Sequence, residues 1–274
     1  MKDFYVKHKI ISPIGGEDYY QEVPASYMNK LSRRGELKDS ENVVAFIKGT
    51  EKPDEIIVIS AHLDHVGMNK DGEVFNGADD DGSGTVAVLE IAEAFKKAIN
   101  DGHGPKRSIL FLHVTGEEKG LLGSRYYTEN PIFPITNTIA NLNIDMIGRV
   151  DERHKGNPNY VYLIGSDKLS TSLHEVSEAM NTKYTSLELD YKYNDENDPN
   201  RFYYRSDHYN FAKLNVPIIF YFNGTHADYH KETDTPDKIN YEQLETRTRL
   251  VFHTAWEVAN REATIVADKV EKAE

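Results

Sequence analysis

Short, nearly continuous apolar runs alternate with longer mixed stretches along most of this chain. The runs are typical of buried strands and cover residues 43–47, 56–60, 109–114, 139–144, 161–164 and 216–222. The mixed stretches place apolar residues three and four positions apart, as on one face of a helix, over residues 85–99, 120–127, 169–180 and 241–266. Strands that alternate with helices predict an α/β sandwich built on a largely parallel sheet.

The beginning of the chain does not follow this pattern. Residues 1–41 are polar, with a turn signal at Pro13-Ile14-Gly15-Gly16 and mixed charges between Lys30 and Lys38. We therefore predict an N-terminal arm or lead-in segment over residues 1–41 and one large domain over residues 42–274. A chain of 274 residues is of a size that a single hydrophobic core can fill.

Charge and composition exclude several classes of protein. The formal net charge of −13 argues against a nucleic-acid-binding surface, which needs clustered Lys and Arg. No apolar run approaches the roughly 20 residues that a membrane-spanning helix needs. The chain has no cysteine, so thiolate metal sites, thiol nucleophiles and disulfides are excluded. Any metal must therefore be bound by His, Asp and Glu.

Three consecutive acids, Asp79, Asp80 and Asp81, lie between glycines after the second predicted strand. Neighbouring carboxylates repel one another, so a folded turn that holds all three is expected to hold a cation as well. Other candidate ligands follow predicted strands: His62, Glu117, Glu118, Asp145 and, after a longer loop, His230. Because the ligand site of an open α/β sheet lies outside the carboxyl ends of its strands, we expect these side chains to converge.

The segments that contain these residues resemble those of a known family. They are His62-Leu63-Asp64, Gly77 to Gly84, Gly116 to Ser124, Asn143 to Met146, and Tyr229 to Thr235. In this order they look like the five signature segments of the co-catalytic di-zinc aminopeptidases, the bacterial leucine-type enzymes of peptidase clan MH. The resemblance covers roughly residues 42–262. It implies a zinc-exopeptidase fold, which is a three-layer sandwich with a mixed, mostly parallel central sheet flanked by helices.

The resemblance also implies that the chain binds two zinc ions. Asp80 would bridge the two ions. The first site would be completed by His62 and Asp145, and the second by Glu118 and His230. Imidazole and carboxylate are ligands that zinc accepts, and a shared carboxylate lets two dications approach within about 3.5–4 Å.

Residues around the ligands receive roles from the same resemblance. Glu117 would be the general base that takes a proton from the metal-bridging water and later gives it to the leaving amine. Tyr229 would donate a hydrogen bond to the oxyanion. Asp64 is expected to fix the tautomer of His62, and Asp234 that of His230. Asp207, in the segment Arg205-Ser206-Asp207-His208, is expected to support the site structurally.

Alternatives stay open for the last ligand and for the reaction. His226 and His208 compete with His230, although only His230 precedes the sequence Lys-Glu-Thr-Asp-Thr-Pro. We predict a metallo-aminopeptidase that acts on peptides with a free amino terminus. The alternatives are a single-zinc glutaminyl cyclase, a carboxypeptidase-type relative and a non-catalytic relative. The intact acid triplet, the retained Glu117, and Tyr229 where cyclases tend to carry Trp all favour the aminopeptidase.

The sequence is less informative about location. The first residues, Met1 to Tyr5, lack the apolar core of a signal peptide. Because members of the resembled family are mostly exported, we expect a periplasmic or secreted protein whose leader is absent from this sequence. A cytoplasmic location is the alternative. The pattern predicts neither the oligomeric state nor the role of residues 190–205.

Overall fold

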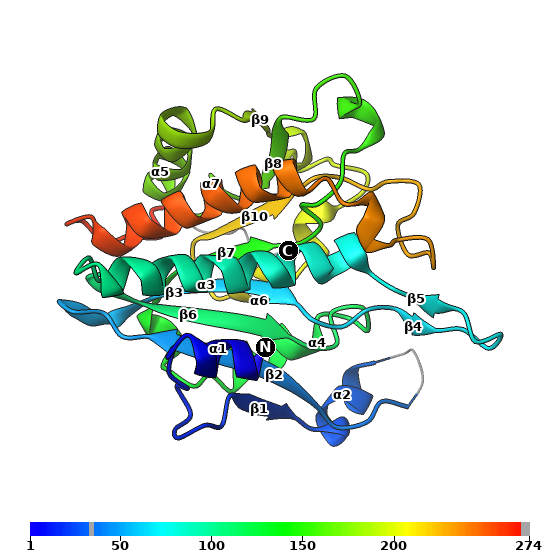
Figure 1. Cartoon of the computed structure of the whole chain (residues 1–274), viewed down its shortest axis with the longest axis horizontal. Helices are drawn as coiled ribbons and strands as arrows, with labels where there is room; N and C mark the ends of the chain where they lie inside the picture. Colours follow the sequence, from blue (N-terminus) through cyan, green and yellow to red (C-terminus); the bar gives the residue numbers. More distant parts are fainter. Residues whose placement is uncertain (33–35, 270–274) are drawn as a thin grey trace.

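The computed structural model describes residues 1–32 and 36–269, and within them the chain forms an eight-stranded sheet (Figure 1). Across the sheet the strands follow the order β1 (Tyr20–Val23), β2 (Ser40–Ile47), β6 (Arg107–Val114), β3 (Lys52–His62), β7 (Thr138–Ile144), β10 (Ile218–Phe222), β8 (Tyr160–Ile164) and β9 (Glu188–Asp190). The pairs β6–β3, β3–β7, β7–β10 and β8–β9 are parallel. The pairs β1–β2, β2–β6 and β8–β10 are antiparallel. The sheet is therefore mixed and mostly parallel, as predicted.

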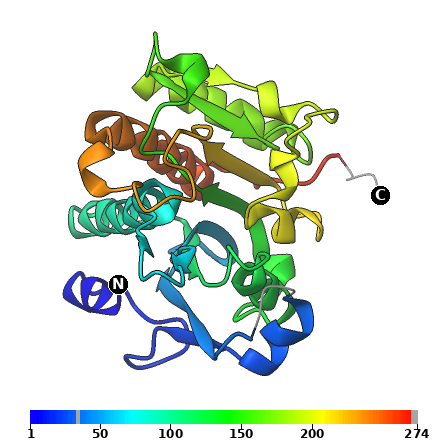
Figure 2. The same ribbon diagram turned by 90° about the vertical axis from the view of Figure 1, so that its right-hand side faces the viewer.

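Helices cover both faces of this sheet and complete a three-layer sandwich (Figures 1 and 2). One face carries α1 (Lys2–Lys7), α3 (Gly84–Asn100), α5 (Thr171–Met180) and α7 (Tyr241–Asn260). The other face carries α4 (Leu122–Glu129) and α6 (His208–Ala212), with α2 (Ala25–Leu31) beside α4. The smaller elements are the hairpin strands β4 (Gly67–Met68) and β5 (Val74–Phe75) and short helical turns at Ala78–Ser83, Ile135–Asn137, Glu152–His154, Asn181–Thr185, Lys192–Asn194, Phe202–Tyr204 and Pro236–Lys238. Among the helices of the described ranges, none has the length and apolarity needed to cross a bilayer.

The central strands read as continuous apolar runs because both of their faces are buried. Ile57 and Ile59 of β3 pack with Phe95 of α3 in the core on one face. Val58, which points the other way, packs with Phe211 of α6 in the core on the opposite face. Burying one such side chain contributes about 1.5–3 kcal/mol. This two-sided burial fixes the register of the strands and therefore the edge at which they end.

The described part of residues 1–41, predicted as an arm or lead-in segment, contains the regular elements α1, β1 and α2. The edge strand β1 pairs with β2, and α1 packs onto the sandwich through Tyr5, which is fully buried. Tyr19 is also buried, and its hydroxyl donates a hydrogen bond to the carbonyl of Ile10 at 2.6 Å. Single buried residues among polar neighbours give no periodic signal, which explains why the sequence pattern did not reveal these elements.

Four adjacent parallel strands bring distant parts of the chain to one edge of the sheet. β6, β3, β7 and β10 run in the same direction, so their carboxyl ends meet at this edge. His62 is the last residue of β3, and Asp145 directly follows β7. Glu117 and Glu118 lie in the loop after β6, and His230 lies in the longer loop after β10. The topology therefore gathers the candidate ligands that the sequence singled out.

Candidate metal centre

Asp80 lies at the centre of the site, with one carboxylate oxygen near each of two histidines. Its Oδ1 atom lies 3.1 Å from Nε2 of His62, and its Oδ2 atom lies 3.0 Å from Nε2 of His230. His62 belongs to the end of a central strand, whereas His230 belongs to the loop before α7. A single carboxylate thus joins two separate parts of the fold.

Two groups of potential ligands share this carboxylate. The first consists of His62, Asp80 and Asp145, and the second of Asp80, Glu118 and His230. Within each group the ligand atoms lie within 4.8 Å of one another. Asp145 Oδ1 is 3.8 Å from His62 Nε2, and Glu118 Oε2 is 3.2 Å from His230 Nε2. The structure therefore brings together the five residues that were predicted as ligands.

The chemistry of these groups fits divalent cations. His62 Nε2 and Asp80 Oδ2 are buried and, within the described residues, have no hydrogen-bond partner of regular geometry. The carboxylates of Asp80 and Glu118, 3.0 and 3.2 Å from His230 Nε2, raise the pKa of His230 to about 9, because nearby negative charge favours a cation. Imidazole nitrogen and carboxylate oxygen are the donor set that zinc accepts in the absence of cysteine.

The other two acids of the triplet shape the loop. Asp81 Oδ2 accepts a hydrogen bond from the backbone N–H of His62 at 3.2 Å, and its Oδ1 accepts one from Met146 at 3.1 Å. Asp79 Oδ1 accepts a hydrogen bond from the backbone N–H of Gly148 at 2.6 Å. These bonds fasten the acid loop to β3 and to the segment after β7, so that Asp80 is held between them.

Asp64 supports the site differently from the way the sequence predicted. Its backbone carbonyl lies 2.9 Å from Nδ1 of His62, whereas its carboxylate oxygen Oδ1 lies 3.8 Å from that atom. The carboxylate accepts hydrogen bonds from the backbone N–H groups of Glu117 at 3.0 Å and Glu118 at 3.3 Å. The backbone carbonyl is thus the nearer acceptor for an Nδ1–H group, and that tautomer leaves Nε2 available to a metal.

Asp234 binds the backbone of the acid loop, where the sequence predicted a contact with the ring of His230. Its Oδ2 atom accepts hydrogen bonds from the N–H groups of Asp79 at 3.0 Å and Asp80 at 3.2 Å. His226, the alternative last ligand, lies outside both ligand groups, with its Nε2 atom 3.2 Å from Asp79 Oδ2. Both residues therefore stabilise the loop that presents Asp80.

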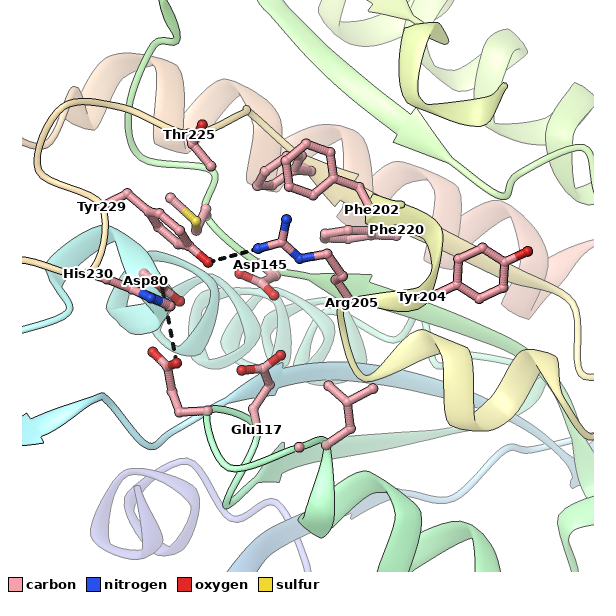
Figure 3. Close-up of a pocket in the computed structure, with 15 residues that line it drawn as sticks. Asp80, Glu117, Asp145, Phe202, Tyr204, Arg205, Phe220, Thr225, Tyr229 and His230 are labelled. Carbon is pink, nitrogen blue, oxygen red and sulfur yellow. Dashed lines mark hydrogen bonds and ion pairs between the residues drawn. The ribbon is translucent and has the colours of Figure 1, made fainter. Parts of the chain in front are cut away.

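Glu117 lines the pocket beside the ligand groups (Figure 3), and Asp207 is fully buried. Burial raises the pKa of Glu117 well above its usual value, and the neighbouring carboxylates add to this effect. Burial also raises the pKa of Asp207 to about 7. A carboxyl group with a raised pKa beside potential metal ligands is suited to exchange protons near neutral pH.

The ligand groups form one side of a pocket of about 270 Å³ (Figure 3). The other side is mainly apolar and is formed by Leu121, Met146, Phe202, Phe220 and Phe222. Tyr229 stacks on His230 with ring centroids 3.9 Å apart, and its hydroxyl accepts a hydrogen bond from Arg205 at 3.3 Å. The pocket can therefore hold a small molecule with a polar group at the ligands and an apolar group against the aromatic rings.

Two residues of the site received no role from the sequence. The Ser206 hydroxyl donates a hydrogen bond to Asp145 Oδ2 at 2.6 Å and accepts one from the Asn143 side chain at 2.9 Å. Arg205 lines the pocket, as do Phe202 and other residues of the preceding loop. The only signal available for Arg205 and Ser206 was their position next to Asp207, because single polar residues in a loop have no periodicity.

Both the sequence and the fold of this chain are similar to those of known proteins. The model of Peptidase family M28 matches residues 42–255. Leupeptin-inactivating enzyme 1 of Streptomyces exfoliatus is 31% identical over 191 residues, which cover 69% of this chain and 37% of that protein. A probable glutamate carboxypeptidase of Arabidopsis thaliana is 32% identical over 139 residues, which cover 50% of this chain and 19% of that protein.

The fold is similar to the solved structure of BSAP, a zinc aminopeptidase from Bacillus subtilis. The two chains match with a TM-score of 0.65 and 25% identity, over 85% of this chain and 54% of that chain. This chain thus spans less than two thirds of the length of each of these relatives.

Proposed function

Because the chain belongs to peptidase family M28, we propose that it is a zinc-dependent aminopeptidase that removes amino-terminal residues from peptides. The shared carboxylate of Asp80 supports this proposal most directly. Its two oxygens lie near two different histidines, each of which belongs to a separate group of three potential ligands. Such an arrangement suits a pair of ions that act together on one scissile bond.

We propose a site for two zinc ions. Asp80 would be shared, His62 and Asp145 would hold one ion, and Glu118 and His230 would hold the other. When bound, zinc would polarise the scissile carbonyl and lower the pKa of the attacking water. The chain itself supplies the groups that move protons and position the substrate.

Glu117 is placed to act as the general base. Its carboxylate lines the same pocket as Asp80 and Asp145, and its backbone is fixed by the hydrogen bond to Asp64. In this role it takes the proton from the attacking water and transfers it to the nitrogen of the leaving amine. The Tyr229 hydroxyl accepts a hydrogen bond from Arg205, so its own proton is available to the oxyanion that forms when water attacks the carbonyl carbon and the carbonyl oxygen takes up the negative charge.

The pocket also supports the choice of the amino-terminal end of a peptide. A free α-ammonium group would lie close to the carboxylates of Glu117 and Asp145, which favour a cation. The side chain of the first residue would then face the apolar side of the pocket, next to Phe202 and Phe220. This geometry favours unblocked peptides over peptides with an acylated amino terminus.

A substrate comparison tests the proposed reaction. Purified protein is incubated with aminoacyl fluorogenic amides, the same amides with a blocked amino group, and peptides that begin with glutamine. We expect release of fluorophore from the unblocked amides only, loss of activity with a chelator, and recovery when zinc is returned. Cleavage of blocked substrates alone, activity that resists the chelator, or cyclisation of glutamine without hydrolysis would contradict the proposal.

Metal analysis tests the number of ions separately from the reaction. We expect about two zinc ions per chain in the unchanged protein and about one in both His62→Ala and His230→Ala. Asp80→Ala should lose more zinc than either histidine variant, because both groups share Asp80. His103→Ala, which changes an exposed loop histidine, serves as the control. Equal zinc contents in Asp80→Ala and the control would contradict the shared site.

The predicted export of the protein also stays a proposal, supported by the family resemblance alone. Fractionation of cells that make the protein, with activity on an unblocked amide as the readout, would test it. Activity confined to the cytoplasm would contradict it.

A further inference from the structure

Arg205 carries a positive charge into the pocket from the end of the helical turn Phe202–Tyr204 (Figure 3). One terminal nitrogen donates to the hydroxyl of Tyr229 at 3.3 Å, and the other reaches the carbonyl of Asn200 at 3.5 Å. The guanidinium carbon lies 4.8 Å from the centre of the Phe202 ring. These contacts hold the guanidinium group at the pocket while the residue stays exposed.

Among the described residues, the charge of Arg205 is not used in an ion pair. In the part of the chain that the structure describes, no carboxylate lies within 4.0 Å of its guanidinium nitrogens. Five other arginines each pair with an acid: Arg107 with Glu55, Arg125 with Glu129, Arg149 with Asp228, Arg153 with Asp190, and Arg249 with Glu245. A guanidinium group has five N–H donors, and the bonds to Tyr229 and Asn200 use two of them. Donors and charge are therefore available to a ligand.

Charge balance in the pocket makes this cation important. The four carboxylates that line the pocket, Asp80, Glu117, Glu118 and Asp145, would face the zinc ions and the α-ammonium group of the substrate. Arg205 would then be left without a counter-charge in the pocket. In a partly desolvated pocket, such a charge attracts an anionic group on the substrate.

We propose that Arg205 sets the substrate class by binding a carboxylate that the peptide carries close to the scissile bond. This inference rests on the proposed aminopeptidase function. Arg205 lines the same pocket as the ligand groups, so a carboxylate that it binds must lie close to the scissile bond. It is supplied either by the carboxyl terminus of a dipeptide or by an Asp or Glu side chain. Both have the same chemistry, because the planar guanidinium group can donate two parallel hydrogen bonds to either carboxylate.

A different role for Arg205 makes a different prediction. If the residue only positioned the hydroxyl of Tyr229, its loss would slow the hydrolysis of every substrate by a similar factor. If it binds a substrate carboxylate, its loss must affect substrates with that carboxylate more than their neutral analogues. The ratio between matched substrates therefore separates recognition from positioning.

The experiment compares two matched pairs of substrates. Leu-Leu and Leu-Leu amide differ only in the terminal carboxylate, and the glutamyl and glutaminyl anilides differ only in the side-chain carboxylate. Values of kcat/KM are measured for the unchanged protein, Arg205→Gln and Arg205→Lys. Arg201→Gln is the control, because Arg201 lies four residues away, beside the Tyr204 ring, and does not line the pocket.

We expect Arg205→Gln to lower the preference for the carboxylate member of one pair by about tenfold or more, mainly through KM. The pair that responds identifies the source of the carboxylate. Arg205→Lys should retain part of the preference, since it keeps the positive charge but cannot donate two parallel hydrogen bonds. The control Arg201→Gln should retain the whole preference. Unchanged ratios for both pairs in Arg205→Gln would overturn the proposal.

A binding measurement keeps this test separate from the proposed reaction. Calorimetry on the zinc-loaded protein compares a reduced-bond Leu-Leu analogue with its carboxy-terminal amide, and a reduced-bond Glu-Leu amide with the matching Gln-Leu amide. If no peptide is hydrolysed, the proposed aminopeptidase function fails, yet a carboxylate preference that Arg205→Gln removes would still support the recognition site. Equal affinities for acid and amide in both pairs would overturn it.

Discussion

The Oδ1 atom of Asp64 accepts a hydrogen bond from the backbone N–H of Glu117 at 3.0 Å. This bond connects the loop after β3 with the loop after β6, at the edge where the two parallel strands end. The second oxygen of Asp64 accepts from the adjacent N–H of Glu118 at 3.3 Å. One carboxylate therefore fixes the backbone of both glutamates, although their side chains have different roles in the proposed site.

Replacing Asp64 tests this connection. In Asp64→Ala the two N–H groups lose their acceptor, so the loop should move and kcat should fall by about 10–100-fold. Asp64→Asn keeps one oxygen acceptor, so its kcat should fall by a smaller factor than that of Asp64→Ala. Zinc content should stay close to that of the unchanged protein in Asp64→Asn, because the side chain is not a member of either ligand group. Kinetics on an unblocked amide with parallel zinc analysis measures both effects, and an unchanged kcat in Asp64→Ala would show that the bond is dispensable.

Adjacent glutamates provide a matched pair of substitutions. Glu117→Gln should keep its zinc and lose about 10²–10⁴ in kcat, since an amide cannot take a proton from water. Glu118→Gln should lose zinc, because Glu118 belongs to a ligand group with His230 and Asp80. Metal analysis and kcat are measured on both variants. The proposed division of roles fails if Glu118→Gln keeps its zinc or if Glu117→Gln is as active as the unchanged protein.

The buried histidine of β6 should make the protein sensitive to acid. His113 is fully buried, its Nε2 atom lies 2.6 Å from the Tyr5 hydroxyl, and burial lowers its pKa to about 3. In the unfolded chain its pKa is about 6.5, so between these two values the unfolded state binds more protons. The stability from neutral His113 is complete above about pH 6.5 and is lost as the pH falls toward 3, at about 1.4 kcal/mol per pH unit.

Denaturant unfolding between about pH 6 and pH 4, with a chelator present, measures this dependence. The chelator removes the contribution of metal release. His113→Gln should show a shallower loss of unfolding free energy than the unchanged protein, whereas His103→Gln, at an exposed position, should not. Burial also lowers the pKa of His208 to about 3. A second substitution at His208 should therefore reduce the dependence of the unfolding free energy on pH further. Equal slopes for His113→Gln and His103→Gln would contradict the prediction.

The first helix should contribute to the stability of the whole domain. Tyr5 is fully buried, whereas the next residue, Val6, is 39% exposed. Tyr5→Ala should lower the free energy of unfolding by about 3–5 kcal/mol, as large aromatic truncations in a core do. Val6→Ala keeps the helix and should change the free energy of unfolding by less than about 0.5 kcal/mol. Urea unfolding measures both variants, and similar losses in the two would mean that α1 does not share the core.

The sequence predicted the central strands and the site segments because both leave a local signal. A strand such as β3, buried on both faces, reads as a continuous apolar run, and a ligand such as Asp145 directly follows its strand. The helix predicted over residues 241–266 instead ends at Asn260. Buried Arg107 donates hydrogen bonds to the carbonyls of Val258 and Arg261 there, a contact between residues far apart in the chain. No local pattern contains that information.

The same limit explains the errors around the site. A spacing of two residues placed Asp64 near His62, but it did not distinguish the backbone carbonyl from the carboxylate. Asp234 lies close to His230 in sequence, yet its carboxylate binds the N–H groups of the acid loop. The interest of Arg205 comes from its contact with Tyr229 and from the absence, in the described chain, of a carboxylate within 4.0 Å of its guanidinium nitrogens. Such roles depend on the folded arrangement of loops.

The parallel arrangement of the central strands also separates the two ends of the sandwich. β6 runs for eight residues, which is about 26 Å, between the loop over residues 101–106 and the loop that carries Glu117. Gly102 and His103 in the first loop are exposed, and a Cβ atom at Gly102 would have nothing within 4 Å. This end of the molecule is thus a natural place to graft an affinity module or a reporter domain without reaching the edge that carries the potential metal ligands.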